Sequence, residues 1–317
     1  MAKNSEQIKE LVNQVRINGT LAEIKTFEGN TKEKNTPYIS VDGQIRYGNT
    51  AVETARFRMF CLAEKADGTE SKAYKTLCDW VDKAVPMTDS VENATKLCLT
   101  ANVVDNDFYN AQDELVEGIG FNGRFINPYE EENETYVSQA SMTVDGYVQS
   151  ITDEIRNEEP TGRKRFTLVT TDYTRRAIII KNIIVPQDLV DAFDDVIEKG
   201  TCAQFFLGYY LHKGEKRVVN TGGIGRQRTT TGRDYTELIF EGCSVPYEED
   251  SPYFIDSKIL KELMNNRQAH LDELKERHEA SESNVSKTTA NRRGVATKSK
   301  SKPAEMDDIV SDDDIPF

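Results

Sequence analysis

The sequence predicts an all-β chain with accessory helices, organised as two similar five-stranded barrels and a disordered C-terminal tail. Three observations predict this fold. One pattern of strand-like runs occurs twice, an amphipathic segment interrupts each copy at the same point, and hydrophobic periodicity is lost after about residue 280. At 317 residues the chain also exceeds the usual size of one domain, which favours two.

Each copy of the pattern opens with apolar and polar residues that alternate around a central glycine. These glycines are Gly19, within residues 16–24, and Gly146, within residues 143–151. Alternation predicts a half-buried strand, and a glycine at its centre predicts a sharp bend. Four further strands are expected in each copy. They are 38–46, 52–62, 96–104 and 115–126 in the first, and 163–171, 175–185, 203–211 and 235–244 in the second.

One amphipathic helix is expected between the third and fourth strands of each copy. The two apolar stripes at helical spacing are Tyr74, Leu77, Cys78 and Val81, and Leu189, Phe193, Val196 and Ile197. Three strands, a helix and two strands is the order of the OB-fold, a five-stranded Greek-key barrel that binds oligonucleotides. The sequence therefore predicts tandem OB-folds. Two unrelated small β domains with one helix each, or another small barrel, remain the alternatives.

Two further helices are predicted outside the barrels. The first carries the stripe Ile8, Leu11, Val12 and Val15 after good capping residues. The second spans residues 257–279, where Arg267 interrupts the apolar stripe. It either packs on a barrel, which we favour, or pairs with a second copy.

The expected units follow from these elements and from a composition without periodicity near the C-terminus. They are the N-terminal helix with the first OB-fold (1–135), the second OB-fold (136–250), the C-terminal helix (251–280), a disordered linker (281–306) and an acidic tip (307–317).

Composition argues against several classes of protein. No run approaches the 18 apolar residues of a membrane span, and residues 1–10 lack the apolar core of a signal peptide. The five cysteines are scattered without a Cys-x-x-Cys pair, which indicates reduced thiols and a cytoplasmic location. We find no catalytic or P-loop motif and no metal-ligand spacing, so we expect a non-enzymatic protein without cofactor or metal.

The C-terminal tip joins an acidic run to an apolar end. A partner with an apolar pocket and a basic rim would accept such a segment. Its residues are Asp312, Asp313, Asp314, Ile315, Pro316 and Phe317. This ending resembles the C-terminal tip of bacterial single-stranded DNA-binding proteins. The resemblance implies that the tip recruits replication and repair proteins such as a polymerase, helicase, primase or nuclease. A solvated acidic tail that ends in Phe by chance is the alternative.

The two-barrel layout departs from that bacterial family, whose usual member has one barrel per chain and assembles four in a tetramer. A chain with two barrels and this tip resembles a bacteriophage-encoded protein, located in the cytoplasm of its bacterial host, or a bacterial two-barrel variant. A homodimer would supply four barrels, and a monomer fits equally well.

Candidate DNA-binding residues follow from how single strands are held, by aromatic rings under the bases and by Lys or Arg along the phosphates. The net charge is −14, but residues 1–139 carry −8 and residues 140–247 only −1. In the first copy the candidates are Arg46, Tyr47, Arg56, Arg58, Phe60, Phe108 and Tyr109. Strand alternation places Arg56, Arg58 and Phe60 on one face, and Phe57 and Met59 on the other.

The candidates in the second copy surround its second and third strands and its last loop. They are Arg163, Arg165, Phe166, Tyr173, Arg175, Arg176, Arg226, Arg228 and Arg233. The loop 222–233 contains four glycines and is expected to close over a bound strand. Ordinary solvated charge is the alternative for each cation.

Together these features predict sequence-independent binding and protection of single-stranded DNA in replication, recombination and repair, with partner recruitment through the tip. Two rivals remain. One is a protein-binding adaptor, which the acidic first copy favours. The other is a recombination mediator or annealing protein.

Overall fold

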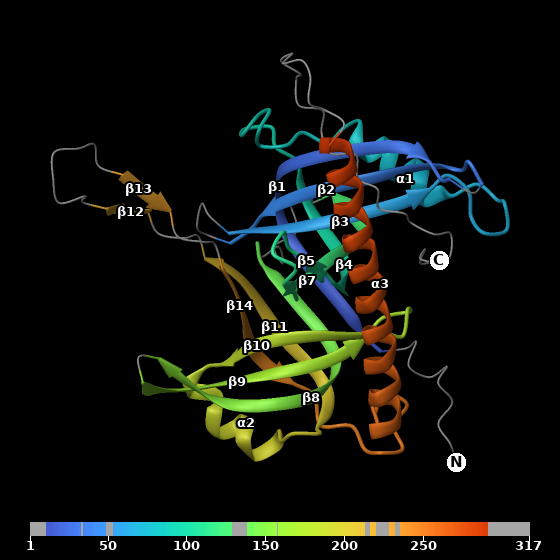
Figure 1. The fold of residues 1–317 in the computed structure, drawn as a ribbon. Helices are drawn as coiled ribbons and strands as arrows, with labels where there is room; N and C mark the ends of the chain where they lie inside the picture. Colours follow the sequence, from blue (N-terminus) through green and yellow to red (C-terminus); the bar gives the residue numbers. More distant parts are fainter. Residues whose placement is uncertain are drawn as a thin grey trace.

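The computed structural model describes residues 11–32, 34–48, 53–128, 138–156, 158–212, 216–219, 228–231 and 235–290. Within these residues, a ten-stranded sheet closes into two barrels. Figure 1 shows the barrels one above the other, with the long helix α3 (Ser257–Ala290) running alongside both. No helix in the described ranges is long and apolar enough to span a membrane.

The first barrel is a closed ring of five strands. Its strands are β1 (Asn13–Asn30), β2 (Pro37–Arg46), β3 (Thr54–Leu62), β4 (Lys96–Asp105) and β7 (Ile119–Pro128). β1 pairs with β2 and β2 with β3, β3 runs parallel to β7, and β4 pairs with both β7 and β1. Helix α1 (Lys72–Val81) lies between β3 and β4, and a small hairpin of β5 (Phe108–Tyr109) and β6 (Leu115–Val116) lies between β4 and β7.

The second barrel repeats this topology. Its strands are β8 (Ala140–Arg156), β9 (Glu159–Thr171), β10 (Ala177–Val185), β11 (Cys202–His212) and β14 (Tyr235–Cys243). β10 and β14 form the one parallel pair, and β11 closes the ring by pairing with both β14 and β8. The turn η2 (Gln187–Leu189) and helix α2 (Val190–Val196) precede β11, and a separate ribbon of β12 (Lys216–Val219) and β13 (Arg228–Thr231) follows it. The prediction of tandem OB-folds is confirmed.

The first strands of the two barrels match in detail. The ladder of β1 shifts register between Leu21 and Glu23, and that of β8 shifts between Val148 and Ser150. Each shift starts two residues after the central glycine, so the bulge occupies the same place in both copies. A bulge at this point increases the twist and lets one strand serve both sides of its barrel. The shared bulge argues against two unrelated β domains.

Position 19 requires a glycine, because the backbone at Arg46 passes too close to it to leave room for a side chain. A Cβ atom at Gly19 would lie 2.2 Å from the carbonyl oxygen of Arg46, which a backbone atom cannot avoid by rotating. We expect Gly19→Ala to lower the free energy of unfolding by about 3 kcal/mol, as overpacking against a rigid neighbour does. Urea denaturation at unchanged m-value measures this. Gly118→Ala is the control, because its Cβ would meet nothing closer than 3.5 Å. Equal effects of the two substitutions would contradict this account of the bend.

The two barrels are joined through strands and rings. β1 pairs with β8 from Asn13 opposite Val144 to Ile17 opposite Ala140, so one sheet continues across the junction. The hydroxyl of Tyr47 donates to the carbonyl oxygen of Tyr209 in the second barrel at 2.9 Å.

Helix α3 fastens the barrels through Arg267, which is only 4 % exposed. Its Nη2 lies 2.6 Å from Asp107 Oδ2 and 2.9 Å from Glu117 Oε1, both in the β4–β7 connection of the first barrel. Its Nη1 donates to the carbonyl oxygen of Ala177, at the start of β10 in the second barrel, at 3.3 Å. The arginine that interrupts the apolar stripe is thus a buried link between the two barrels. The favoured expectation, that this helix packs on a barrel, agrees with its contacts to β10 and β5.

Two sequence-based boundaries need correction. The helix predicted over Ile8 to Val15 is wrong at its end, because Val15 lies in β1 with a fully buried side chain. Residues 1–10 lie outside the described residues. At the other end, α3 continues to Ala290, into the segment predicted to be a disordered linker. Adding a turn to an existing helix costs less than starting one, so a polar segment can extend it. The predicted tail beyond residue 290 lies outside the described ranges.

Candidate nucleic-acid interface

The outer face of β1, β2 and β3 in the first barrel carries three aromatic side chains, which we call the ring cluster: Phe27, Tyr38 and Phe60. Phe27 and Phe60 flank Ser40, which pairs with Phe27 on one side and Phe60 on the other. Phe27 is 40 % exposed. The rings of Tyr38 and Phe60 lie 5.2 Å apart between centroids, tilted by 33°. The cluster therefore offers partly exposed rings on the face that OB-folds use for oligonucleotides.

Cations continue the same face beyond the ring cluster. In the next row, Lys25 and Arg58 both pair in register with Asp42, whose Oδ1 accepts from Arg58 Nε at 2.9 Å. Arg56 follows on β3 as an exposed side chain, and Arg46 ends β2. An exposed ion pair such as Arg58–Asp42 is worth at most about 1 kcal/mol, so a phosphate can readily replace the carboxylate.

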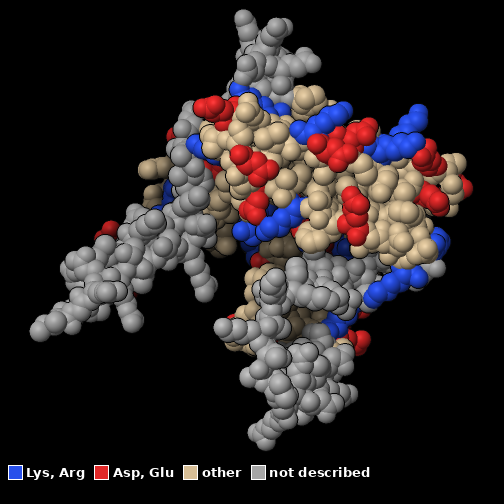
Figure 2. All heavy atoms as spheres, turned by 90° about the horizontal axis from the view of Figure 1, so that it is seen from above, with Lys and Arg blue, Asp and Glu red and all other residues tan. Residues whose placement is uncertain are grey.

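The described surface seen from above (Figure 2) is mixed in charge. In the view from above in Figure 2, Lys and Arg side chains are interspersed with Asp and Glu over the described part of the surface. The net charge of residues 1–139 is −8. Binding at the first barrel would therefore depend on the rings and their adjacent cations more than on a broad positive field.

The second barrel carries an arginine cluster on β8 and β9, formed by Arg156, Arg163 and Arg165. All three guanidinium groups contact the carboxylate of Glu154, which is 3 % exposed. Burial raises the pKa of Glu154, but the hydrogen bonds from Arg165, Thr161 and Arg163 outweigh burial and lower it to about 2. The carboxylate therefore stays ionised at neutral pH.

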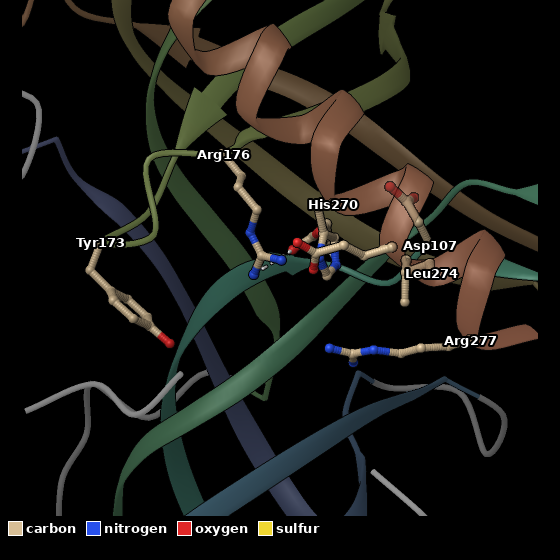
Figure 3. A pocket seen from close by; sticks show the side chains of 8 residues that line it. Asp107, Tyr173, Arg176, His270, Leu274 and Arg277 are labelled. Carbon is tan, nitrogen blue, oxygen red and sulfur yellow. Dashed lines mark ion pairs between the residues drawn. The ribbon is translucent and has the colours of Figure 1, made fainter. Parts of the chain in front are cut away.

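The β9–β10 turn contributes Tyr173 and Arg176 to a cavity of about 210 Å³ between the barrels and α3. Figure 3 shows Arg176 and His270 approaching one another from the turn and from α3. Arg176 Nη2 lies 3.9 Å and His270 Nε2 3.7 Å from the Asp105 carboxylate. The neighbouring Arg175 has φ of 56°, and its carbonyl oxygen accepts from Asn266 Nδ2 at 2.8 Å. These arginines thus belong to the joint between barrels and helix.

The small hairpin of the first barrel docks on α3. Tyr109 stacks on the ring of His278, with 6.0 Å between centroids and 28° between planes. Phe108, its neighbour, is 48 % exposed. Of the two predicted rings, Tyr109 is engaged within the protein and Phe108 presents its surface to solvent.

Two of the predicted base-stacking rings are corrected by their burial. Phe166 is 1 % exposed and packs against Phe193 and Phe205, with centroids 5.1 Å and 5.7 Å away. Tyr47 is 2 % exposed and lies in the barrel junction. A base cannot stack on a ring that the protein already covers on both faces.

Other predicted site residues fall where no side chain is described. Arg226, Arg233 and the tip residues 312–317 lie outside the described ranges, and Arg228 is described only as part of β13. Sequence reasoning also missed Phe27, Tyr38 and Lys25. Alternation along β1 could have identified them. It places Lys25 and Phe27 on the same face, and that face continues onto Tyr38 and Phe60. In the described part of the chain, no group of three or more His, Cys, Asp or Glu side chains could hold a metal ion.

Comparisons with known proteins place the chain in a family. Two similar solved structures are a deletion mutant and the wild-type form of the single-stranded DNA binding protein from Thermus aquaticus. Both align with a TM-score of 0.46, at 12 % and 11 % identity, over 76 % of this chain and 98 % and 96 % of theirs. A sequence search of curated proteins finds no match. The family model YorF matches residues 11–277, and the chain belongs to the YorF family.

Proposed function

We propose that this protein binds single-stranded DNA without sequence selectivity and acts without catalysis. The observation that carries the proposal is the ring cluster beside Arg56 and Arg58 on the outer face of β1, β2 and β3. Rings next to cations, on a surface open to solvent, match the two requirements for holding a single strand, which are base stacking and phosphate contact.

The form of this face favours single strands over duplexes. Stacking on a side chain requires an unpaired base with a free face, and each stacked base contributes about 1–3 kcal/mol. Every base has such a face, so the rings give affinity without reading sequence. Because cations meet phosphates, binding is expected to weaken as salt is raised and counterions return to the DNA.

The proposed cellular role has two parts, the coating of single strands by the barrels and the recruitment of partners by the tip. We propose that the barrels protect single-stranded DNA during replication, recombination and repair, and that residues 312–317 recruit partner enzymes. The acidic run followed by Phe317 supports this second role, because it suits a partner pocket that is apolar at its base and basic at its rim. The mixed charge of the first barrel keeps a protein-binding adaptor as the second candidate.

Fluorescence anisotropy with labelled oligo-dT and a duplex of the same length, at two salt concentrations, tests the proposal on the full chain. We expect the single strand to bind at least about tenfold more tightly than the duplex, with weaker binding at higher salt. Equal affinity for both would contradict single-strand binding. No binding to either, together with capture of a defined replication protein, would favour the adaptor.

A further inference from the structure

The two barrels differ at one equivalent position of the repeat. Phe27 lies eight residues after Gly19, and Glu154 lies eight residues after Gly146. The first bulge falls at the same point in both strands, and β8 has a second register shift between Asp153 and Ile155, at Glu154 itself. Where the first barrel presents a partly exposed ring, the second carries a buried carboxylate surrounded by arginines. The same fold thus presents different chemistry on corresponding strands.

Glu154 is fully occupied by donors from its own barrel. Its Oε2 accepts from Arg163 Nε at 2.6 Å and from Thr161 Oγ1 at 2.8 Å, and lies 2.5 Å from Arg163 Nη2. Its Oε1 accepts from Arg165 Nη2 at 2.5 Å and Nε at 3.1 Å, and from Arg156 Nε at 3.3 Å. The guanidinium groups of Arg163 and Arg165 are therefore held by the two oxygens of one carboxylate. Glu154 determines where both groups lie.

The arginine cluster still has capacity for an anion. The side chains of Arg163, Arg165 and Arg156 are 28 %, 29 % and 55 % exposed. Among the described residues, no protein oxygen accepts from Nη1 of Arg163 or Arg165. Among the described residues, Glu237 is a second carboxylate in contact with the cluster, and its Oε1 lies 3.6 Å from Arg156 Nη2. Three cations against two carboxylates leave one net positive charge.

The neighbouring Lys164, Asp194 and Asp153 bring the formal charge around the cluster to zero, so binding of a phosphate would depend on the exposed, fixed guanidinium groups. Lys164, between the two arginines on β9, is paired with Asp194 of α2 at 2.6 Å. Asp153 pairs in register with Lys164 and is exposed. Guanidinium groups that are already fixed lose little freedom when they bind, which favours a planar, bidentate contact with a phosphate.

We propose that Arg156, Arg163 and Arg165, held in place by Glu154, form a phosphate-binding site through which the second barrel binds the sugar-phosphate backbone, while the ring cluster of the first barrel binds bases. The inference deepens the proposed function and rests on it for the identity of the ligand, single-stranded DNA. Glu154 is a positioning residue in this site and makes no contact with the strand.

The direction in which Glu154→Gln changes DNA affinity distinguishes a positioning role for Glu154 from a purely electrostatic one. Glu154→Gln removes a negative charge, so a cluster that attracts phosphate only by its net charge would bind more tightly. If Glu154 positions the arginines, the same substitution weakens binding, because a neutral amide cannot hold two guanidinium groups in place. We expect a loss of about tenfold, the factor that corresponds to one charge-assisted contact. Asp153→Asn is the matched control, because it removes the same charge from an exposed neighbour.

The probes are oligo-dT and an abasic deoxyribose-phosphate oligomer of the same length, titrated against the full chain. We expect Glu154→Gln to weaken binding of both probes, and Phe27→Ala with Phe60→Ala to weaken only oligo-dT. Thermal melting checks that each variant folds. Should Glu154→Gln fail to fold, Arg163→Lys with Arg165→Lys preserves the charge and is expected to show the same loss.

Two outcomes would overturn the phosphate site. One is tighter binding by Glu154→Gln, of the kind expected for Asp153→Asn. The other is failure of the wild-type protein to bind the abasic oligomer. If it still binds oligo-dT, the proposed function stands without the phosphate site, and if it binds neither probe, both fail.

Discussion

Replacing Phe27 and Phe60 together by alanine is expected to weaken binding of oligo-dT by about thirtyfold or more. Each lost stack removes about 1–3 kcal/mol, and 1.4 kcal/mol corresponds to a tenfold change in affinity. Both rings lie on the outer face of the first barrel, where Ser40 separates them. Because Phe27 is 40 % exposed, its loss should cost the fold little. Anisotropy titration measures the affinity, and thermal melting measures the stability.

Phe206→Ala is the matched control for this pair. Phe206 is 39 % exposed, close to the exposure of Phe27, but it lies on β11 of the second barrel, opposite Thr143 of β8. Its removal takes away a similar exposed ring and is expected to leave affinity for oligo-dT unchanged. A loss of affinity from Phe206→Ala equal to that of the double variant would mean that bases do not stack specifically on the ring cluster.

Arg267→Ala is expected to be the most destabilising single change in the joint between the barrels. It would leave the buried carboxylate of Asp107 and the half-buried Glu117 without the cation that links them to α3. Removing one member of a buried ion pair costs about 3–5 kcal/mol. Urea denaturation of the full chain measures this loss. Lys275→Ala, an exposed cation on the same helix that does not line the cavity, is the control and should change stability by less than about 0.5 kcal/mol.

The pH dependence of that loss follows from Asp107. Burial already raises the pKa of Asp107, and Arg267 is among the groups that lower it. Without Arg267 the pKa rises further. A carboxyl with a raised pKa in the folded state destabilises that state as pH rises above its ordinary pKa. The cost of Arg267→Ala should therefore be smaller at pH 5 than at pH 7. A cost that is small and independent of pH would mean that Arg267 does not hold the barrels together.

The barrels could be predicted because their signals are local. Alternation of apolar and polar residues, a glycine at each bend and helical spacing between the third and fourth strands are all visible within short windows. The same alternation could have excluded Phe166 from the site. If Arg163 and Arg165 point outward, Phe166 must point inward, as its 1 % exposure shows.

The joint between the barrels could not be predicted, because its partners are far apart in sequence. Arg267 forms ion pairs with Asp107 and Glu117, which are about 150 residues away in the sequence. Tyr47 donates a hydrogen bond to the backbone of Tyr209. At the N-terminus, Leu11, Val12 and Val15 fit a helical stripe, but pairing with β4 and β8 places Val15 in a strand. Tertiary pairing thus overrides a short local pattern.

Photocrosslinking of the wild-type protein to an oligo-dT that carries 5-iodouracil, followed by peptide mapping, tests most directly whether a single strand lies on the ring cluster. We expect crosslinks at Phe27, Tyr38 or Phe60 in the first barrel. Crosslinks confined to another exposed aromatic surface, such as Phe206 and Tyr210 on β11, would contradict the account.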